Sequence, residues 1–340
     1  MTILNAVARR PRVRRVDVWF RDAAAQTRRI ARSGGKPERK IAATLMIPWE
    51  GLQYSVRGSP MPSMMTRVIP KTGEALPVIG CGTYRGFDVR LAGAEYQALL
   101  GVLRALLDAG GSVLDSSPMY GRAEAVSGRL LADMGARGST FLATKVWTRG
   151  RADGIEQMER SLSLLQTAQI DLMQVHNLVD WRTHLDTLAG WKRQGRVRYV
   201  GVTHYHSGAH AELASVIEQV DLDFVQLDYS LEDRAAEARL LPLAQDRGLA
   251  VLVNLPFGGG GLLRSLAREP LPAFAAELGA ASWSQLLLGF VLGHPAVTCV
   301  IPGTGNPEHM ASNAAAAASD VSAVREQMAA WLARRGRGAT

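Results

Sequence analysis

Short apolar segments alternate with longer amphipathic segments along most of the chain, from about residue 66 onward. The longer segments place apolar residues three and four positions apart, which predicts helices over 95–107, 154–165, 207–218 and 283–292. The short segments are rich in Val, Ile and Leu, which is typical of strands buried on both faces. These predicted strands span 78–81, 112–115, 140–145, 170–176, 197–202, 224–227, 249–254 and 297–301.

The number and order of these elements define the fold class. Eight strand-helix units within residues 66–340 predict an α/β protein with a (β/α)8 TIM barrel, whose usual size is about 250 residues. A short hairpin over 67–76 precedes the first strand. The competing architecture is a doubly wound sheet, but the GxGxxG turn of that fold is missing after the first strand.

The charge of the chain divides at residue 65. The whole chain carries a net charge of +8, whereas residues 1–65 alone carry +9 and residues 66–340 carry −1. Residues 1–65 also lack apolar periodicity, so we predict a basic, disordered N-terminal extension followed by the barrel domain at 66–340. An alternative interpretation is that translation starts later, at Met61, Met64 or Met65.

Composition narrows the class of protein further. The extension contains no apolar run long enough for a signal peptide or a membrane span, so we expect a cytoplasmic protein without a membrane partner. Two cysteines, Cys81 and Cys299, exclude a disulfide framework, and we expect no metal site. The net positive charge is confined to the extension, so we expect no nucleic-acid partner, and we expect a monomer.

Polar or ionisable residues stand at the ends of seven of the eight predicted strands. In a barrel of this type the active site is built at the C-terminal ends of the strands. The residues at these ends are Gly82-Thr83-Tyr84, Asp115, Lys145, His176, Thr203-His204, Gln226, Asn254 and Pro302-Gly303.

Four residues near these ends suit acid catalysis on a carbonyl group: Asp115, Tyr120, Lys145 and His176. We expect the Lys145 ammonium to lower the pKa of the Tyr120 phenol, and Asp115 to keep the lysine charged and oriented. A neutral His176 imidazole can donate a hydrogen bond to a substrate oxygen. Tyr120 can then protonate a carbonyl oxygen while hydride arrives from a cofactor, because no side chain donates hydride.

Candidate cofactor contacts lie around the same end of the barrel. Gln226 and the pair Thr203-His204 can hydrogen-bond a carboxamide. The glycine-rich run at 256–263 offers backbone N–H groups for a pyrophosphate, although the run by itself is a weak signal and a flexible loop is the better-supported interpretation. A helix that begins near Pro307 provides a further anion site at its N-terminus.

Residues 66–318 resemble the aldo-keto reductase family. The shared motifs are GCGTY at 80–84, D-S-S-P-M-Y-G at 115–121, ATKVW at 143–147, DLMQVHN at 171–177, GRVRYVGVTHY at 195–205, DFVQLDYS at 223–230 and CVIPGTGNPEHMASN at 299–313. The resemblance implies reduction of aldehydes or ketones with NADPH, Tyr120 acting as proton donor, Lys145 and Asp115 tuning its pKa, and His176 orienting the carbonyl group.

The same resemblance extends to the binding residues. It implies that Thr304 and Asn313 contact the adenosine end of the cofactor, and that Tyr84 and Trp147 form aromatic walls of the substrate pocket. The cofactor-binding residues predicted from strand ends, loops and resemblance together are Gly82, Thr83, Thr203, His204, Gln226, Asn254, Phe257, Gly258, Pro302, Gly303, Thr304, His309 and Asn313.

The chain departs from the family pattern at several residues that are expected to contact the cofactor. Thr203-His204 replaces the more common Ser-Asn. Asn254 replaces a tyrosine that stacks on the nicotinamide, so another residue, such as Phe257, would have to stack on that ring. Gly303 and His309 stand where basic residues often hold the 2′-phosphate. We therefore expect NADPH to be used with weak discrimination against NADH.

Two other functions are consistent with part of the pattern. Lys145 is a candidate Schiff-base lysine of an aldolase-type lyase, and the barrel is a candidate for a catalytically weak NAD(P)H-binding regulatory or sensor protein. The intact set of four catalytic residues favours the reductase. The short sequence after Asn313 indicates an open pocket for a small carbonyl substrate, whose identity the sequence leaves undefined.

Overall fold

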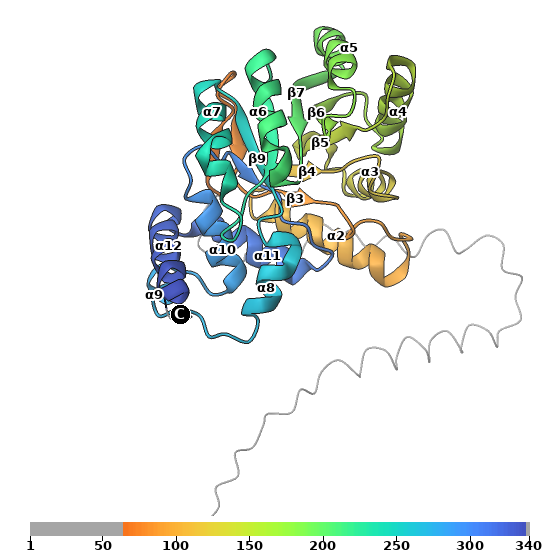
Figure 1. Ribbon diagram of the computed structural model, residues 1–340. Helices are drawn as coiled ribbons and strands as arrows, with labels where there is room; N and C mark the ends of the chain where they lie inside the picture. The colour runs from red at the N-terminus through yellow and green to blue at the C-terminus, as the bar shows by residue number, and fades with distance from the viewer. Residues whose placement is uncertain (1–63, 338–340) are drawn as a thin grey trace, which may run out of the picture. The chain divides into compact units, whose positions relative to one another are not determined.

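The computed structural model describes residues 64–337, with side chains up to Arg334 (Figure 1). The strands are β1 (Thr66–Val68), β2 (Ala75–Pro77), β3 (Cys81–Gly82), β4 (Val113–Asp115), β5 (Phe141–Val146), β6 (Ile170–His176), β7 (Val197–Thr203), β8 (Phe224–Asp228), β9 (Ala250–Asn254) and β10 (Cys299–Val300). The α-helices are α2 (Gly93–Asp108), α3 (Ala123–Met134), α4 (Arg151–Leu164), α5 (Trp181–Arg193), α6 (His210–Gln219), α7 (Leu240–Asp246), α8 (Gly261–Leu266), α9 (Phe274–Glu277), α10 (Trp283–Leu292), α11 (Pro307–Ala315) and α12 (Val321–Arg337).

Strands β3 to β10 form one parallel sheet in chain order, with the helices packed around it (Figure 1). Two isolated parallel bridges, Ile79 with Val300 and Gly82 with Gly303, join the first strand to the last and close the barrel. At this seam the chains approach so closely that a side chain on Gly82 would place its Cβ 2.9 Å from the Ile301 carbonyl oxygen. The predicted TIM barrel is confirmed.

The hydrophobic core has two layers. One fills the barrel interior and includes Phe141, Leu172, Tyr199 and Phe224 from alternate positions of the strands. The other lies between the strands and the helices. The β1–β2 hairpin contributes the buried residues Ile69 and Leu76 to the interior layer, so the hairpin covers one end of the barrel.

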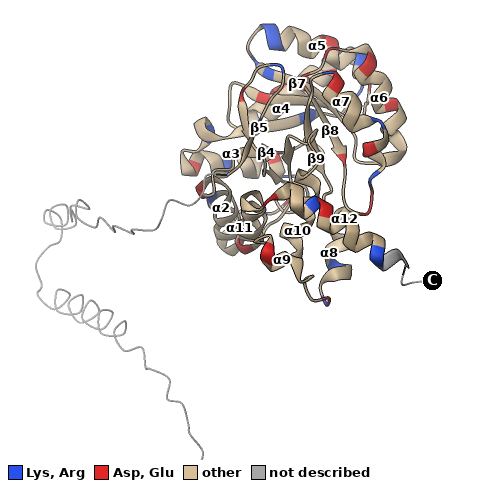
Figure 2. Cartoon of the chain, turned by 90° about the vertical axis from the view of Figure 1, so that its left-hand side faces the viewer, with Lys and Arg blue, Asp and Glu red and all other residues tan. Residues whose placement is uncertain are grey.

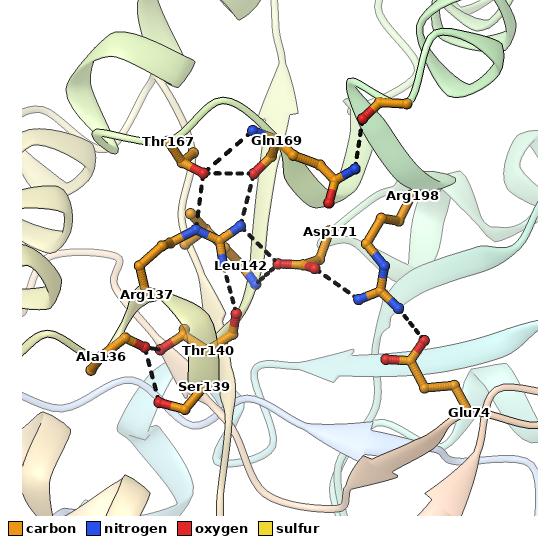
Figure 3. Close-up of polar contacts among 11 residues, drawn as sticks. Glu74, Ala136, Arg137, Ser139, Thr140, Leu142, Thr167, Gln169, Asp171 and Arg198 are labelled. Carbon is orange, nitrogen blue, oxygen red and sulfur yellow. Dashed lines mark hydrogen bonds and ion pairs between the residues drawn. The ribbon is translucent and has the colours of Figure 1, made fainter.

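A charged network fastens the hairpin to the starts of the strands (Figure 3). Asp171, at the start of β6, accepts hydrogen bonds from Arg137, Arg198 and the backbone N–H of Leu142. Arg198 also pairs with Glu74 of the hairpin. Arg137 also donates to the Thr167 hydroxyl oxygen and to the carbonyl oxygens of Thr140 and Gln169. Through these four hydrogen bonds, Arg137 holds the strand ends together.

Most predicted strand positions lie within two residues of the observed strands, and the helix predicted over 283–292 coincides with α10. The first and last strands are shorter than predicted because single bridges replace a continuous ladder at the seam. The long connection between β9 and β10 contains α8 and α9, which the sequence pattern did not predict. Their few buried residues give little periodic signal.

The extension predicted for residues 1–65 lies outside the described residues, apart from Met64 and Met65. Met64 is buried, and the carbonyl oxygen of Met65 accepts a hydrogen bond from the N–H of Val78. The described fold therefore includes two residues before the predicted boundary at 66.

Charged residues of both signs are interspersed over the helices of the barrel, as Figure 2 shows. This agrees with the nearly balanced charge of residues 66–340. Within residues 64–337, no helix is both long enough and apolar enough to cross a membrane.

Candidate active site

Neighbouring strands bring a lysine and an aspartate together at the C-terminal end of the barrel. Asp115 ends β4 and Lys145 lies near the end of β5, which pairs with β4. Lys145 is fully buried, and its Nζ donates to Asp115 Oδ2 and to the Ser116 carbonyl oxygen, both at 2.7 Å. Because these two acceptors satisfy a charge that burial alone would disfavour, the lysine is held as an ammonium in a fixed position.

The pKa values of this pair follow from burial and mutual attraction. Burial works against the charged form of Lys145, but Asp115 and then Tyr120 outweigh it, so the pKa of Lys145 lies above its ordinary value. Burial raises the pKa of Asp115, and the ion pair with Lys145 opposes that rise.

Tyr120 lies over this ion pair. A turn in which its N–H donates to the Ser117 carbonyl oxygen at 3.0 Å folds the loop after β4 back over the barrel. Lys145 Nζ lies 5.2 Å from the centre of the Tyr120 ring. Tyr84 packs on the other side, with ring centres 5.0 Å apart. The predicted grouping of Asp115, Tyr120 and Lys145 is thus present in the structure.

Lys145 lowers the pKa of Tyr120, as expected, but it does not set the net direction of the shift. Burial raises the pKa of the phenol above its ordinary value, and the Lys145 ammonium only partly offsets this rise. The phenol is therefore protonated at neutral pH and available as a proton donor, and Lys145 stabilises the negative charge that develops when the proton leaves.

His176 ends β6 and faces Tyr120 edge-on, with ring centres 6.0 Å apart. Burial, followed by the positive charge of Lys145 and the neighbouring His204, lowers the pKa of His176 to about 3. The imidazole is therefore neutral at pH 7, as the sequence predicted. Its Nδ1 lies 3.1 Å from the hydroxyl oxygen of Ser117.

Two aromatic residues border the site on the solvent side. Tyr84 is 52% exposed and Trp147 is 42% exposed, which leaves both rings free to contact a ligand. The Trp147 ring centre lies 6.4 Å from that of His176. Both predicted substrate-pocket residues therefore lie beside the four catalytic candidates.

The loop that carries Trp147 is fixed by side chains of two helices. Gln157 of α4 binds both backbone groups of Trp147, accepting from its N–H at 2.5 Å and donating to its carbonyl oxygen at 3.2 Å. The buried His184 of α5 donates from Nε2 to the Thr148 carbonyl oxygen at 2.8 Å. Asp180 accepts from the N–H of Gly150 at 2.8 Å. The loop is therefore pre-formed.

Two amide side chains lie beside the ion pair, and a third stands at the end of β9. Gln174 of β6 is fully buried and donates to Gln226 Oε1 at 2.8 Å and, more weakly, to Asp115 Oδ1 at 3.5 Å. Asn254, at the end of β9, donates weakly to the His204 carbonyl oxygen at 3.4 Å. The Oδ1 atom of Asn254 is buried without a donor, so it offers an acceptor to a bound group.

Three predicted cofactor-binding residues, Gly82, Thr83 and Thr203, lie at the strand ends as expected. In the structure their contacts are with other residues of the barrel. Thr83 is buried, and its hydroxyl oxygen lies 3.0 Å from both the Asp115 carbonyl oxygen and Ser116 Oγ. Thr203 is buried in the β6–β7 pairing. His204 is partly exposed and stacks on Tyr205, with ring centres 5.5 Å apart.

The glycine run after β9 is an ordered turn. Gly258, Gly259 and Gly260 have positive φ angles of 55°, 65° and 86°, and they lead directly into α8. The N–H of Gly258 donates to the Leu255 carbonyl oxygen and the N–H of Gly260 to the Phe257 carbonyl oxygen, both at 2.9 Å, so these two amides close the turn and are not free donors for an anion. Nothing lies within 4 Å of a Cβ placed on Gly259, so the turn is open at this residue, and Phe257 beside it is partly buried.

The segment after β10 closes the seam and then starts α11. Pro302 is buried, Gly303 faces Gly82 across the seam, and the hydroxyl oxygen of Thr304 accepts the N–H of Asn306 at 3.0 Å. Asn306 caps α11 by accepting the Glu308 N–H at 2.8 Å. His309 in this helix is exposed, whereas Asn313 is buried.

Several residues that shape the site were not predicted. Ser116, Ser117 and Gln174 hydrogen-bond Lys145, His176 and Gln226 respectively. The serines lie inside the motif at 115–121, and Gln174 lies two residues before His176 on the same face of β6, so position within a motif and strand alternation were usable signals. Gln157 gave no usable signal in the sequence, because a polar residue on an amphipathic helix usually faces solvent.

A (β/α)8 barrel with a buried lysine–aspartate pair, a tyrosine and a neutral histidine at its C-terminal end defines a barrel enzyme equipped for proton transfer to a substrate oxygen. A sequence model of the aldo/keto reductase family matches residues 78–332. The chain belongs to the aldo-keto reductase family, as its motifs indicated.

Individual relatives agree with this assignment. The chain is 31% identical over 265 residues to methylglyoxal reductase YeaE of Escherichia coli, an alignment that covers 74% of this chain and 89% of that protein. It is 30% identical over 220 residues to aldo-keto reductase YhdN of Bacillus subtilis, covering 58% and 62%. A crystal structure of an aldo-keto reductase from Klebsiella pneumoniae in complex with NADPH matches with a TM-score of 0.65 and 27% identity, covering 78% and 96%.

Proposed function

We propose that the protein reduces aldehydes or ketones to alcohols with NADPH, using Tyr120 as the proton donor. The observation that carries this proposal is the buried Lys145–Asp115 ion pair directly beneath the Tyr120 ring, with the neutral His176 at its edge. Family membership and the NADPH-bound relative support the choice of reaction.

The chain's own residues divide the chemistry among them. His176 donates a hydrogen bond to the carbonyl oxygen and fixes its position. The Tyr120 hydroxyl transfers its proton to that oxygen, and Lys145 stabilises the resulting phenolate. Bound NADPH supplies the hydride that the carbonyl carbon accepts. Asp115 holds Lys145 in place and keeps it charged.

The residues around the barrel end fit this cofactor. The buried Oδ1 of Asn254 lacks a donor, which a carboxamide N–H would supply, and the turn after β9 is open at Gly259, where a pyrophosphate could approach the backbone. We propose that Asn313 and Thr304 contact the adenosine end. At the 2′-phosphate, the exposed His309 replaces the basic residues of many relatives, and Glu308 in the first turn of α11 adds a negative charge. We therefore propose weak discrimination against NADH.

Lys145 is poorly suited to the lyase alternative. A Schiff-base lysine must lose its proton to act as a nucleophile, whereas both acceptors of Lys145 and its raised pKa favour the ammonium.

The proposal is tested by following NADPH and NADH oxidation with a panel of aldehydes and ketones. Similarity to methylglyoxal reductase YeaE makes methylglyoxal the first substrate to assay. We expect turnover with both cofactors and a loss of at least about 100-fold in Tyr120→Phe, because a positioned general acid contributes roughly that much. Tyr96→Phe is the matched control, since the Tyr96 hydroxyl contacts Asp133 on the outer helices.

Wild-type rates in Tyr120→Phe would show that the proton donor is assigned wrongly. Tight NADPH binding without turnover on any carbonyl compound would instead favour the sensor function. A strong preference for NADPH that persists in His309→Ala would contradict the proposed cofactor discrimination.

A further inference from the structure

Ser117 places a buried hydroxyl against the catalytic histidine. It lies in the loop between β4 and Tyr120, has no solvent exposure, and its Oγ is 3.1 Å from His176 Nδ1. The same Oγ accepts a weaker hydrogen bond from the backbone N–H of Met119 at 3.4 Å. Among the described residues, these two groups are the polar contacts of the Ser117 side chain.

The direction of the Ser117–His176 hydrogen bond follows from this short set of partners. The Met119 N–H can only donate, so it offers no acceptor to the Ser117 proton. If His176 Nδ1 carried a proton and donated to Ser117, the hydroxyl proton of Ser117 would be buried without an acceptor, which folded proteins strongly avoid. Ser117 therefore donates, and Nδ1 accepts.

A neutral imidazole has one N–H, so fixing Nδ1 as the acceptor places the proton on Nε2. Burial, aided by Lys145 and His204, lowers the pKa of His176 to about 3, so the ring is neutral at pH 7. Within the described chain Nε2 has no hydrogen-bond partner, and it is absent from the fully buried unpaired atoms. Its N–H is thus accessible from the barrel end that Tyr120 and Trp147 border.

We infer that Ser117 is a positioning residue that holds His176 as the Nε2–H tautomer and so directs its only ring proton toward the substrate carbonyl oxygen. This inference rests on the proposed reductase function for its catalytic consequence. The opposite tautomer would present a lone pair to the carbonyl oxygen and repel it. Ser117 thereby acts through His176 without contacting the reacting atoms.

The tautomer is tested first in the unmodified full-length protein by ¹⁵N NMR of the histidine side chains. Protonated and unprotonated ring nitrogens resonate far apart, and His176→Gln identifies the signals of His176. We expect Nε2 to be the protonated nitrogen and Nδ1 the unprotonated one at pH 7. A protonated Nδ1 in the wild-type spectrum would overturn the inference, and this reading requires neither turnover nor a Ser117 variant.

The catalytic consequence is tested with Ser117→Ala and Ser117→Thr. Removing the hydroxyl leaves Nδ1 without its donor, so we expect a mixed tautomer spectrum and a fall in kcat/KM of about 5- to 10-fold, the size of one neutral hydrogen bond. The hydrogen bond from His176 to the carbonyl oxygen strengthens as negative charge develops on that oxygen in the transition state. We therefore expect Ser117→Ala to lower kcat more than it changes KM. Ser117→Thr retains a hydroxyl and restores both the spectrum and the rate.

Ser127→Ala is the matched control, because Ser127 is equally buried in α3 but its Oγ has no hydrogen-bond partner. It should change neither the His176 spectrum nor kcat. Ser117→Ala with the wild-type tautomer and unchanged kcat would contradict the inference. If the wild-type protein reduces no carbonyl compound while its spectrum shows Nε2–H, the proposed function fails and the tautomer assignment stands.

Discussion

The side chains of the site hold a buried ion pair next to a protonated phenol. Lys145 is fully buried yet charged because Asp115 and the Ser116 carbonyl oxygen both accept its protons. The Tyr120 phenol retains its proton because burial outweighs the nearby ammonium. The site therefore offers a protonated acid next to a fixed positive charge, and the positive charge favours the product of proton transfer.

The neutral state of His176 has a measurable cost in stability at low pH. Burial keeps its pKa near 3 in the folded protein, whereas the unfolded chain binds a proton below the ordinary value of 6.5. The unfolded state therefore gains protons as the pH falls below about 6.5, and stability decreases. Relative to His176→Gln, we expect the wild-type free energy of unfolding to fall by about 2 kcal/mol between pH 7 and pH 5.

Chemical denaturation of both proteins at the two pH values measures this difference. Parallel changes in the two free energies of unfolding would show that His176 is protonated in the folded protein at pH 5.

At the scale of elements, strands position the proposed catalytic groups, and loops position the aromatic residues proposed to contact the substrate. The loop after β5 carries Trp147, and Gln157 of α4 holds both backbone groups of that residue. His184 and Asp180 secure the next residues of the loop. Because the loop that carries Trp147 is already fixed, no conformational entropy has to be lost to order it when substrate binds.

Gln157→Ala should loosen this wall without touching the proton donor. We expect KM for carbonyl substrates to rise about 3- to 10-fold, the equivalent of one or two lost hydrogen bonds, while kcat and NADPH affinity stay close to wild type. Steady-state kinetics with methylglyoxal and a bulkier aldehyde measure the change. Gln219→Ala is the control, because its amide contacts only Ser215 on the outer helix α6. An unchanged KM for both substrates would contradict the role of the clamp.

The elements also show what the sequence can and cannot predict. Apolar strands that end in Asp115, Lys145 and His176 were recognisable because a barrel collects strand ends at one rim. Contacts between residues far apart in the sequence could not be recognised, and the Ser117–His176 hydrogen bond spans 59 positions. The net direction of the Tyr120 pKa shift depends on burial, which only the folded chain defines. The short helices α8 and α9 were missed for lack of an apolar stripe.

At the scale of the whole molecule, stability and chemistry occupy opposite ends of the barrel. The proposed catalytic groups lie at the C-terminal ends of the strands, whereas Asp171, Arg137 and Arg198 join the strand starts to the β1–β2 hairpin (Figure 3). This separation lets the residues at one end change without loss of the fold at the other.

Asp171→Ala should therefore destabilise the protein and leave its chemistry intact. Asp171 is nearly buried and receives hydrogen bonds from two arginines and the Leu142 N–H, but both arginines remain partly solvated. We expect a loss of about 2 kcal/mol in the free energy of unfolding, measured by chemical denaturation, with kcat unchanged. Asp186→Ala, which removes an exposed pair with Arg151, should change stability by less than about 0.5 kcal/mol. Equal effects of the two substitutions would contradict the structural role of the network.

The proposed function requires that hydride from NADPH reach a carbonyl carbon in this barrel. The most direct measurement uses NADPH with deuterium at both hydrogen positions of nicotinamide C4, with methylglyoxal or another reactive aldehyde, and locates the label by mass spectrometry and NMR. We expect an alcohol with deuterium on the former carbonyl carbon, formed by the wild type and at least about 100-fold more slowly by Tyr120→Phe. Product without the label, or a borohydride-trapped adduct on Lys145 with no NADPH consumed, would contradict it.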